Sequence, residues 1–154
     1  MSQNKMKTLL WLDDYRDPFL KKNEPAHPYV QMYCPNYYDS DENNIVWVKN
    51  YDEFVAWITE NGLPDKISFD HDLADEHYAP EKRYGDYNDW VSEQEFQEKN
   101  GMDCAKWLVD YCLDNNIEIP SFTVHSANPS GAENIRKLLL NFLTFQLRQK
   151  TDTE

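Results

Sequence analysis

The chain has 154 residues, of which 40% are hydrophobic and 14% aromatic, a composition that excludes an intrinsically disordered protein. Its net charge of -13, from 28 acidic and 15 basic residues, repels polyanions, so we expect no binding to duplex DNA. No apolar run approaches the roughly 20 residues that a membrane-spanning helix needs. The three cysteines form no C-x-x-C motif and no signal sequence is evident, so we expect a soluble protein of the cytoplasm with reduced thiols.

The predicted elements alternate between strands and helices. Short apolar runs rich in β-branched and aromatic residues predict strands at residues 8–12, 45–48, 66–69 and 121–124. Apolar residues at helical spacing predict helices after Asn50, from Gly101 and after Ser130, where Asn50 and Ser130 are the expected caps. This alternation is typical of a single α/β domain with a mainly parallel sheet, here spanning residues 1–154.

Two segments interrupt this pattern. Residues 15–44 contain four prolines and no sustained helical period, so we interpret them as a long irregular connection with room for a short helix. Residues 74–100 are acidic and aromatic, and we interpret them as an insertion over the edge of the sheet. The insertion could be a lid, a surface for a protein partner or a solvated excursion.

Acidic residues follow two of the predicted strands directly. Asp13 and Asp14 end the first strand, and Asp70 and Asp72 end the third. Ligands of open α/β sheets bind outside the carboxyl ends of the strands, so these four carboxylates are expected to meet at one edge. Clustered carboxylates need a cation to stay ionised together, and all-oxygen ligands suit Mg²⁺ or Mn²⁺.

Two histidines lie at the same predicted edge, His71 after the third strand and His125 after the fourth. A lone histidine there is more often structural, but two at neighbouring strand ends favour acid–base chemistry near neutral pH. Flanking carboxylates should favour the charged form of His71, which makes it the expected acid. The positive end of the last helix should keep His125 neutral, which makes it the expected base.

The turn into the last helix is the predicted substrate site. If Ser130 caps this helix, its first N–H groups form an anion site to which Ser126 and Asn128 add hydrogen-bonding groups. Arg16 could contact a phosphate or simply neutralise Asp17.

Four motifs together resemble the cyclic-phosphate processing receiver-like family, a divergent relative of the receiver domains of two-component signalling. They are residues 10–16 (LWLDDYR), 68–73 (SFDHDL), 101–103 (GMD) and 124–129 (VHSANP), the last with Asn134 and Ile135. The resemblance implies a flavodoxin-like three-layer sandwich. With right-handed crossovers, its sheet of about four strands has the order 2-1-3-4, and the fifth strand of a receiver is missing.

The resemblance also implies roles for individual residues. Asp13, Asp14 and Asp70 resemble the positions that hold Mg²⁺ in a receiver, and Ser126 resembles its hydroxyl position. An ordinary receiver has no need of His71, Asp72 or His125.

Our leading hypothesis is a metal-assisted phosphoesterase that opens a cyclic phosphate, in an RNA 2′,3′-cyclic end or a cyclic nucleotide. One alternative is a non-enzymatic module that binds a phosphorylated ligand or a protein partner through its acidic surface and the 74–100 insertion. Another is a receiver-type switch phosphorylated on Asp70, against which the missing strand and its lysine argue.

Overall fold

The computed structural model describes residues 7–18, 28–37, 43–73 and 99–152. Within them, β1 (Lys7–Leu12), β2 (Asn43–Val48), β3 (Lys66–Phe69) and β4 (Ser121–Val124) form one four-stranded sheet. All three pairings are parallel and the order is β2-β1-β3-β4, which confirms the predicted order. The helices are α1 (Pro28–Tyr33), the 3-10 turn η1 (Pro35–Tyr37), α2 (Tyr51–Asn61), α4 (Gly101–Asn115) and α5 (Pro129–Asp152).

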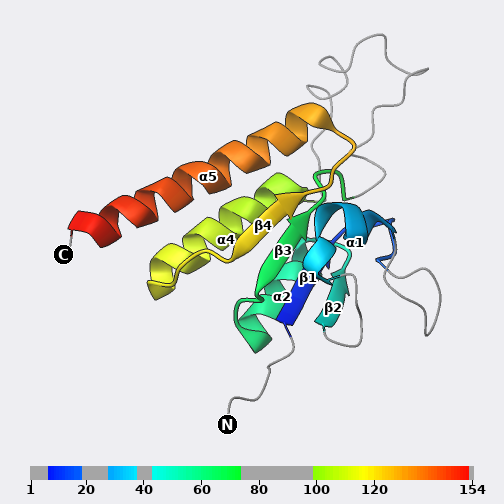
Figure 1. The fold of residues 1–154 in the computed structure, drawn as a ribbon, viewed down its shortest axis with the longest axis horizontal. Coiled ribbons are helices and arrows are strands. Elements are labelled where there is room, and N and C mark those ends of the chain that lie inside the picture. Colours follow the sequence, from blue (N-terminus) through cyan, green and yellow to red (C-terminus); the bar gives the residue numbers. More distant parts are fainter. Residues whose placement is uncertain (1–6, 19–27, 38–42, 74–98, 153–154) are drawn as a thin grey trace.

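The sheet is covered on both faces, which confirms the three-layer, receiver-like fold (Figure 1). Successive side chains of a strand point to opposite faces. Leu10 and Leu12 face the larger core, which they share with residues of α2, α4 and α5. Leu9 and Trp11 face a smaller core under α1 and η1. The helix after β1 and the helix after β2 therefore lie on opposite faces, so β1 and β3 flank the topological switch point where ligands of such sheets bind.

Short-range capping explains where the middle helices begin and end. The Asn50 side chain accepts the Glu53 N–H at 2.8 Å, as predicted, and α2 stops where Gly62 adopts a φ of 82°. Helix α4 begins at Gly101, as predicted, and its cap is Asn100. Asn100 and Asp103 each accept the other's backbone N–H, which is a complete capping box.

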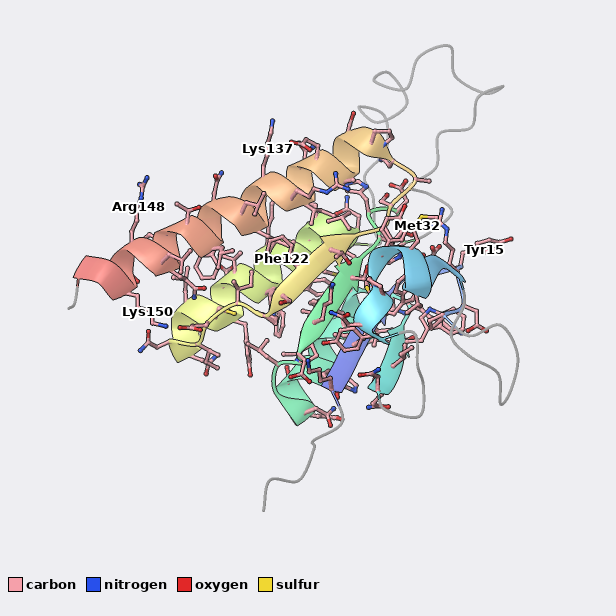
Figure 2. The ribbon with its side chains drawn as sticks, viewed as in Figure 1. Tyr15, Met32, Phe122, Lys137, Arg148 and Lys150 are labelled. Carbon is pink, nitrogen blue, oxygen red and sulfur yellow. The ribbon has the colours of Figure 1, made fainter. Side chains whose placement is uncertain are left out.

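The predicted capping box at Ser130 is wrong. Helix α5 begins at Pro129, and its cap is Asn128, whose side-chain oxygen accepts the Gly131 N–H at 3.0 Å. Proline suits the first helical position because it has no N–H to leave unsatisfied and its φ is already helical. Ser130 is an exposed residue of the first turn. Further along, Lys137 and Arg148 project from the outer surface of α5 (Figure 2).

Only part of the two interrupting segments falls within the described residues. In the 15–44 connection, α1 and η1 are the described elements, so the expectation of a short helix is met there. The 74–100 insertion lies outside the described residues except for its last two positions, and the expectations for it stay predictions. Among the described helices, none is both long enough and apolar enough to cross a membrane.

Candidate functional site

Three site residues are the first residues beyond their strands. The backbone N–H groups of Asp13, Asp70 and His125 donate to carbonyls of the neighbouring strands at 3.0, 2.9 and 2.9 Å. These bonds continue the pattern of the sheet by one residue and fix the backbone there. The predicted meeting of Asp13, Asp70 and His125 at one end of the sheet is therefore observed.

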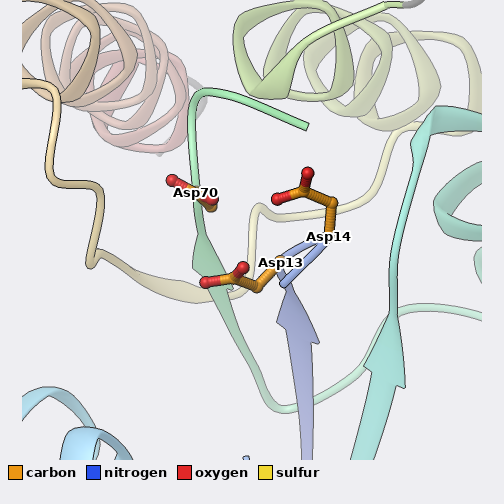
Figure 3. Close-up of side chains that lie close together, drawn as sticks. All are labelled: Asp13, Asp14 and Asp70. Carbon is orange, nitrogen blue, oxygen red and sulfur yellow. The ribbon is translucent and has the colours of Figure 1, made fainter. Parts of the chain in front are cut away.

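Three carboxylates gather at the switch point (Figure 3). One oxygen from each of Asp13, Asp14 and Asp70 lies within 4.8 Å of the other two. Asp13 is fully buried and Asp70 is 3% exposed, so water screens their repulsion poorly. Carboxylate oxygens at this spacing are the donor set that a small hard cation prefers.

Asp72, the fourth predicted ligand, is not a member of this group. Its Oδ1 lies 2.8 Å from Nδ1 of His71, and the contact is partly buried. The structure therefore separates the four aspartates into a cluster of three and a carboxylate–imidazole pair.

The clustered carboxylates have unequal proton affinities. Burial and the charge of Asp13 raise the pKa of Asp70 to about 7, against the lowering effect of Arg16 and a hydrogen bond with Ser126. Burial acts in the same direction on Asp13, but hydrogen bonds from His125 and two backbone N–H groups outweigh it and lower its pKa. Asp70 therefore takes up and releases its proton near neutral pH, as expected of one carboxylate in a group whose members repel one another.

Arg16 is the cation beside this cluster. Its Nη1 lies 3.3 Å from Oδ2 of Asp13 and 3.9 Å from Oδ2 of Asp70. The backbone N–H groups of Tyr15 and Arg16 also donate to Oδ1 of Asp13, at 2.9 and 2.8 Å, so this carboxylate shapes the turn that carries the guanidinium. Tyr15 is 84% exposed and its side chain projects away from the sheet (Figure 2).

Two indole N–H groups donate hydrogen bonds to backbone carbonyls of the same turn. Trp11 Nε1 donates to the Arg16 carbonyl at 3.0 Å, and Trp47 Nε1 donates to the Asp13 carbonyl at 2.6 Å. These bonds restrict the loop on which Asp13, Asp14 and Arg16 are carried.

His71 is packed between the starts of two helices. Its carbonyl accepts the Gly101 N–H at 2.7 Å, and its ring lies against Gly131, where an added Cβ would come within 2.4 Å of Cγ. A Cβ on Gly101 would lie 1.8 Å from the Asp70 carbonyl oxygen. Both glycines therefore allow the helices to approach the site closely. With Nδ1 bonded to Asp72, Nε2 of His71 has no hydrogen-bond partner among the described residues.

His125 lies in a different environment. It is 3% exposed, its ring stacks on Trp11 with centroids 3.8 Å apart, and both ring nitrogens are engaged. Nδ1 lies 2.7 Å from Ser68 Oγ, and Nε2 lies 3.0 Å from Asp13 Oδ2. Burial lowers the pKa of His125, against the raising effect of Asp13. The neutral form is thus favoured as expected, but by burial rather than by the end of α5.

The predicted anion site at the start of α5 offers fewer backbone N–H groups than the sequence suggested. Pro129 has no N–H, and the Gly131 N–H is bonded to Asn128. Asn128 Nδ2 also lies 3.5 Å from both His71 Nδ1 and Asp72 Oδ1, and its backbone N–H donates to Ser126 Oγ at 3.1 Å. Ser126 and Asn128 therefore lie inside the site, whereas Ser130 contributes at most its backbone N–H.

Sequence reasoning missed the residues that support this site. Ser68 is fully buried and bonded to His125, and Gly131 makes room for His71. A signal for Ser68 was present, because it is a polar residue within the apolar run of β3. Nothing local in the sequence indicates that Trp11 stacks on His125, since 114 positions separate them.

One protein family matches this chain over most of its length. No curated protein matches the chain. A solved fusion protein that carries the trimeric coiled coil of yeast Spc42 shares 13% sequence identity, with a TM-score of 0.46 over 97% of this chain and 82% of the other. The model of the cyclic-phosphate processing receiver domain matches residues 8–141, which is most of the chain and includes every residue of the site described above. The chain therefore belongs to the cyclic-phosphate processing receiver family.

Proposed function

We propose that this receiver-like domain is a metal-assisted phosphoesterase that opens a cyclic phosphate by hydrolysis. Its substrate would be an RNA 2′,3′-cyclic end or a cyclic nucleotide. The observation that carries the proposal is the buried group of Asp13, Asp14 and Asp70 at the switch point, with oxygens within 4.8 Å of one another. Membership of a family described by cyclic-phosphate processing supports the choice of substrate.

The residues present fit a divalent cation. Burial and mutual repulsion raise the pKa of Asp70 to about 7, and a cation among the carboxylates would relieve that repulsion. Asp13, Asp14 and Asp70 would hold Mg²⁺ or Mn²⁺. When bound, such an ion offsets negative charge on a phosphate and polarises its P–O bonds. Without it, a phosphate would meet three carboxylates in a chain of net charge -13.

Phosphate contacts would come from the rim of this group. The Arg16 guanidinium is anchored on Asp13 and is the cation next to the cluster. Ser126, Asn128 and the Ser130 N–H are polar groups of the turn into α5. These groups would bind and orient the ring so that a water molecule approaches phosphorus opposite the ring P–O bond that breaks.

The reaction consumes one water. The water gives up one proton as its oxygen forms a new bond to phosphorus. One ring P–O bond breaks, and the leaving oxygen takes up a proton to give a phosphomonoester and a hydroxyl. We assign one of these two proton transfers to Nε2 of His71, because Asp72 engages Nδ1 and so fixes the orientation of the ring. His125 is buried with both nitrogens engaged, so we assign it a supporting role.

A receiver-type switch is less consistent with this site. A phospho-accepting aspartate must be reachable, but Asp70 is 3% exposed, and the described sheet ends at β4, without the fifth strand that carries a receiver's lysine. A binding module that uses the same residues remains as the alternative, and the experiment below separates it from an enzyme.

The experiment is a hydrolysis assay with 2′,3′-cyclic and 3′,5′-cyclic nucleotides and cyclic-ended RNA. We expect turnover with Mn²⁺ or Mg²⁺ that a chelator abolishes. His71→Ala should lower turnover about 10²–10⁴-fold while substrate affinity stays within about tenfold. Asp114→Asn, at an exposed position of α4, is the matched control and should behave as the parent. Binding of these ligands by the parent without hydrolysis of any would instead establish the binding module.

A further inference from the structure

A continuous row of polar side chains, all buried except the partly exposed Thr123, leads from the smaller core to the acidic cluster. It crosses the face of the sheet that α1 covers, and it consists of Cys34, Thr123, Ser68, His125 and Asp13. The successive distances, in that order, are 3.5, 2.8, 2.7 and 3.0 Å. Ser68 is fully buried and His125 is 3% exposed, so water competes little for the two buried hydrogen bonds, Ser68–His125 and His125–Asp13.

The hydrogens in this row can be assigned from the hydroxyl of Thr123, which donates to Ser68 Oγ. Ser68 accepts there, so its own hydrogen can be donated to Nδ1 of His125. An imidazole whose Nδ1 accepts carries its hydrogen on Nε2, which then donates to Asp13.

The remaining bond follows in the same way. Having used its hydrogen on Ser68, Thr123 accepts the thiol hydrogen of Cys34. Burial raises the pKa of Cys34, which keeps that hydrogen on sulfur. Every hydrogen in the row therefore points toward Asp13.

We propose that His125 is a positioning residue for Asp13, and that Ser68 and Thr123 hold its ring in the Nε2–H tautomer. Asp13 is thereby kept with one oxygen bonded to His125 and the carboxylate turned toward the cluster. The role given to Asp13 rests on the proposed function, but the tautomer and its cause do not.

A Ser–His–Asp catalytic triad contains the same residue types, but this row is not a catalytic triad. In a triad the serine contacts Nε2 and the aspartate contacts Nδ1, whereas here the two are exchanged. Ser68 is also fully buried within β3 and cannot reach a substrate. The closer analogy is the outer hydrogen bonds that orient metal ligands, whose loss typically lowers metal affinity or activity by about 10- to 100-fold.

The first test is NMR of the ¹⁵N-histidine-labelled protein at neutral pH, without metal or substrate. We expect His125 to show a protonated Nε2 and an unprotonated Nδ1. A proton on Nδ1 would overturn the proposal. Because no ion or substrate is present, this result stands whether or not the protein proves to be a metal-dependent enzyme.

The second test separates positioning from packing. Ser68→Ala should change the His125 ¹⁵N signals and weaken Mn²⁺ binding, measured by calorimetry, by about 10- to 100-fold. Ser68→Thr keeps the hydroxyl on a strand and should restore both readouts. Thr59→Ala, which removes an exposed hydroxyl of α2, is the control. If Ser68→Ala lowers only the melting temperature and leaves both readouts as in the parent, Ser68 is merely structural and the proposal fails.

A pair of variants at His125 tests the donor itself. His125→Gln places an amide N–H near the Nε2 position, whereas His125→Phe keeps a flat ring against Trp11 but has no N–H. The glutamine variant should bind Mn²⁺ within about tenfold of the parent, and the phenylalanine variant should bind at least tenfold more weakly than the glutamine variant. Equal affinity of the two variants would contradict the positioning role.

Discussion

Gly131 and His71 are in such close contact that no other residue fits at position 131 without moving the imidazole. A Cβ on Gly131 would lie 2.4 Å from Cγ and 2.6 Å from Cδ2 of the ring. Since Asp72 holds the same ring through Nδ1, His71 is fixed from two sides, and its exposed fraction is small. A group meant to transfer a proton benefits from such fixed geometry.

The first prediction follows from this contact. Gly131→Ala should lower turnover by at least tenfold because the ring is displaced. It should also lower the free energy of unfolding, because the clash with a ring that Asp72 holds outweighs the gain of about 1 kcal/mol by which alanine is favoured over glycine inside a helix. Turnover and urea unfolding measured on the same samples test this. Lys137→Ala, an exposed substitution further along α5, should affect neither.

The second prediction concerns the cap of α5. Asn128→Ala should lower the free energy of unfolding by about 1 kcal/mol, because the Gly131 N–H loses its acceptor. Ser130→Ala should change it by less than about 0.5 kcal/mol, since Ser130 is an exposed residue within the first turn. Urea unfolding measures both. A larger loss for Ser130→Ala than for Asn128→Ala would reverse the assignment of the cap.

The third prediction concerns pH. The pKa of Asp70 is about 7 in the folded protein against a usual value of 3.8, so between these values the folded state keeps a proton that the unfolded chain has lost. The contribution of protonated Asp70 to stability is therefore complete below pH 3.8 and is lost as the pH rises toward 7. Without divalent ions, Asp70→Asn should be more stable than the parent at pH 8. Its free energy of unfolding should also lack the part of the pH dependence that comes from Asp70.

Other buried groups contribute to the pH dependence of stability with the opposite sign, so the effect of Asp70 must be measured by comparing variants. The lowered pKa of His125 means that its contribution to stability is present above pH 6.5 and is lost as the pH falls through its folded pKa. Asp114→Asn controls for the removal of a surface charge. If thermal unfolding of Asp70→Asn and Asp114→Asn shows the same pH dependence, Asp70 is not a carboxyl with a raised pKa.

Much of the fold could be predicted because its signals are local. The apolar runs at residues 66–69 and 121–124 coincide with β3 and β4, and the Asn50 cap depends on residues only three positions apart. The order of the strands follows from the handedness of the crossovers, which does not depend on particular side chains.

The support of the site could not be predicted because its contacts are distant in sequence. His125 meets Ser68 across 57 positions and Asp13 across 112, and no periodicity records such pairs. The cap of α5 was misplaced by two residues because Ser130 and Asn128 are both good capping residues, and only the position of Pro129 at the start of the helix decides between them.

The claim on which the account depends most is that Asp13, Asp14 and Asp70 hold one divalent cation. The most direct measurement is a calorimetric titration of the parent protein with Mn²⁺ at pH 8, repeated with Asp13→Asn and with the exposed control Asp114→Asn. We expect one ion per chain for the parent and the control, and at least tenfold weaker binding for Asp13→Asn. The absence of binding to the parent at millimolar Mn²⁺, or equal affinity of Asp13→Asn and the parent, would contradict the account.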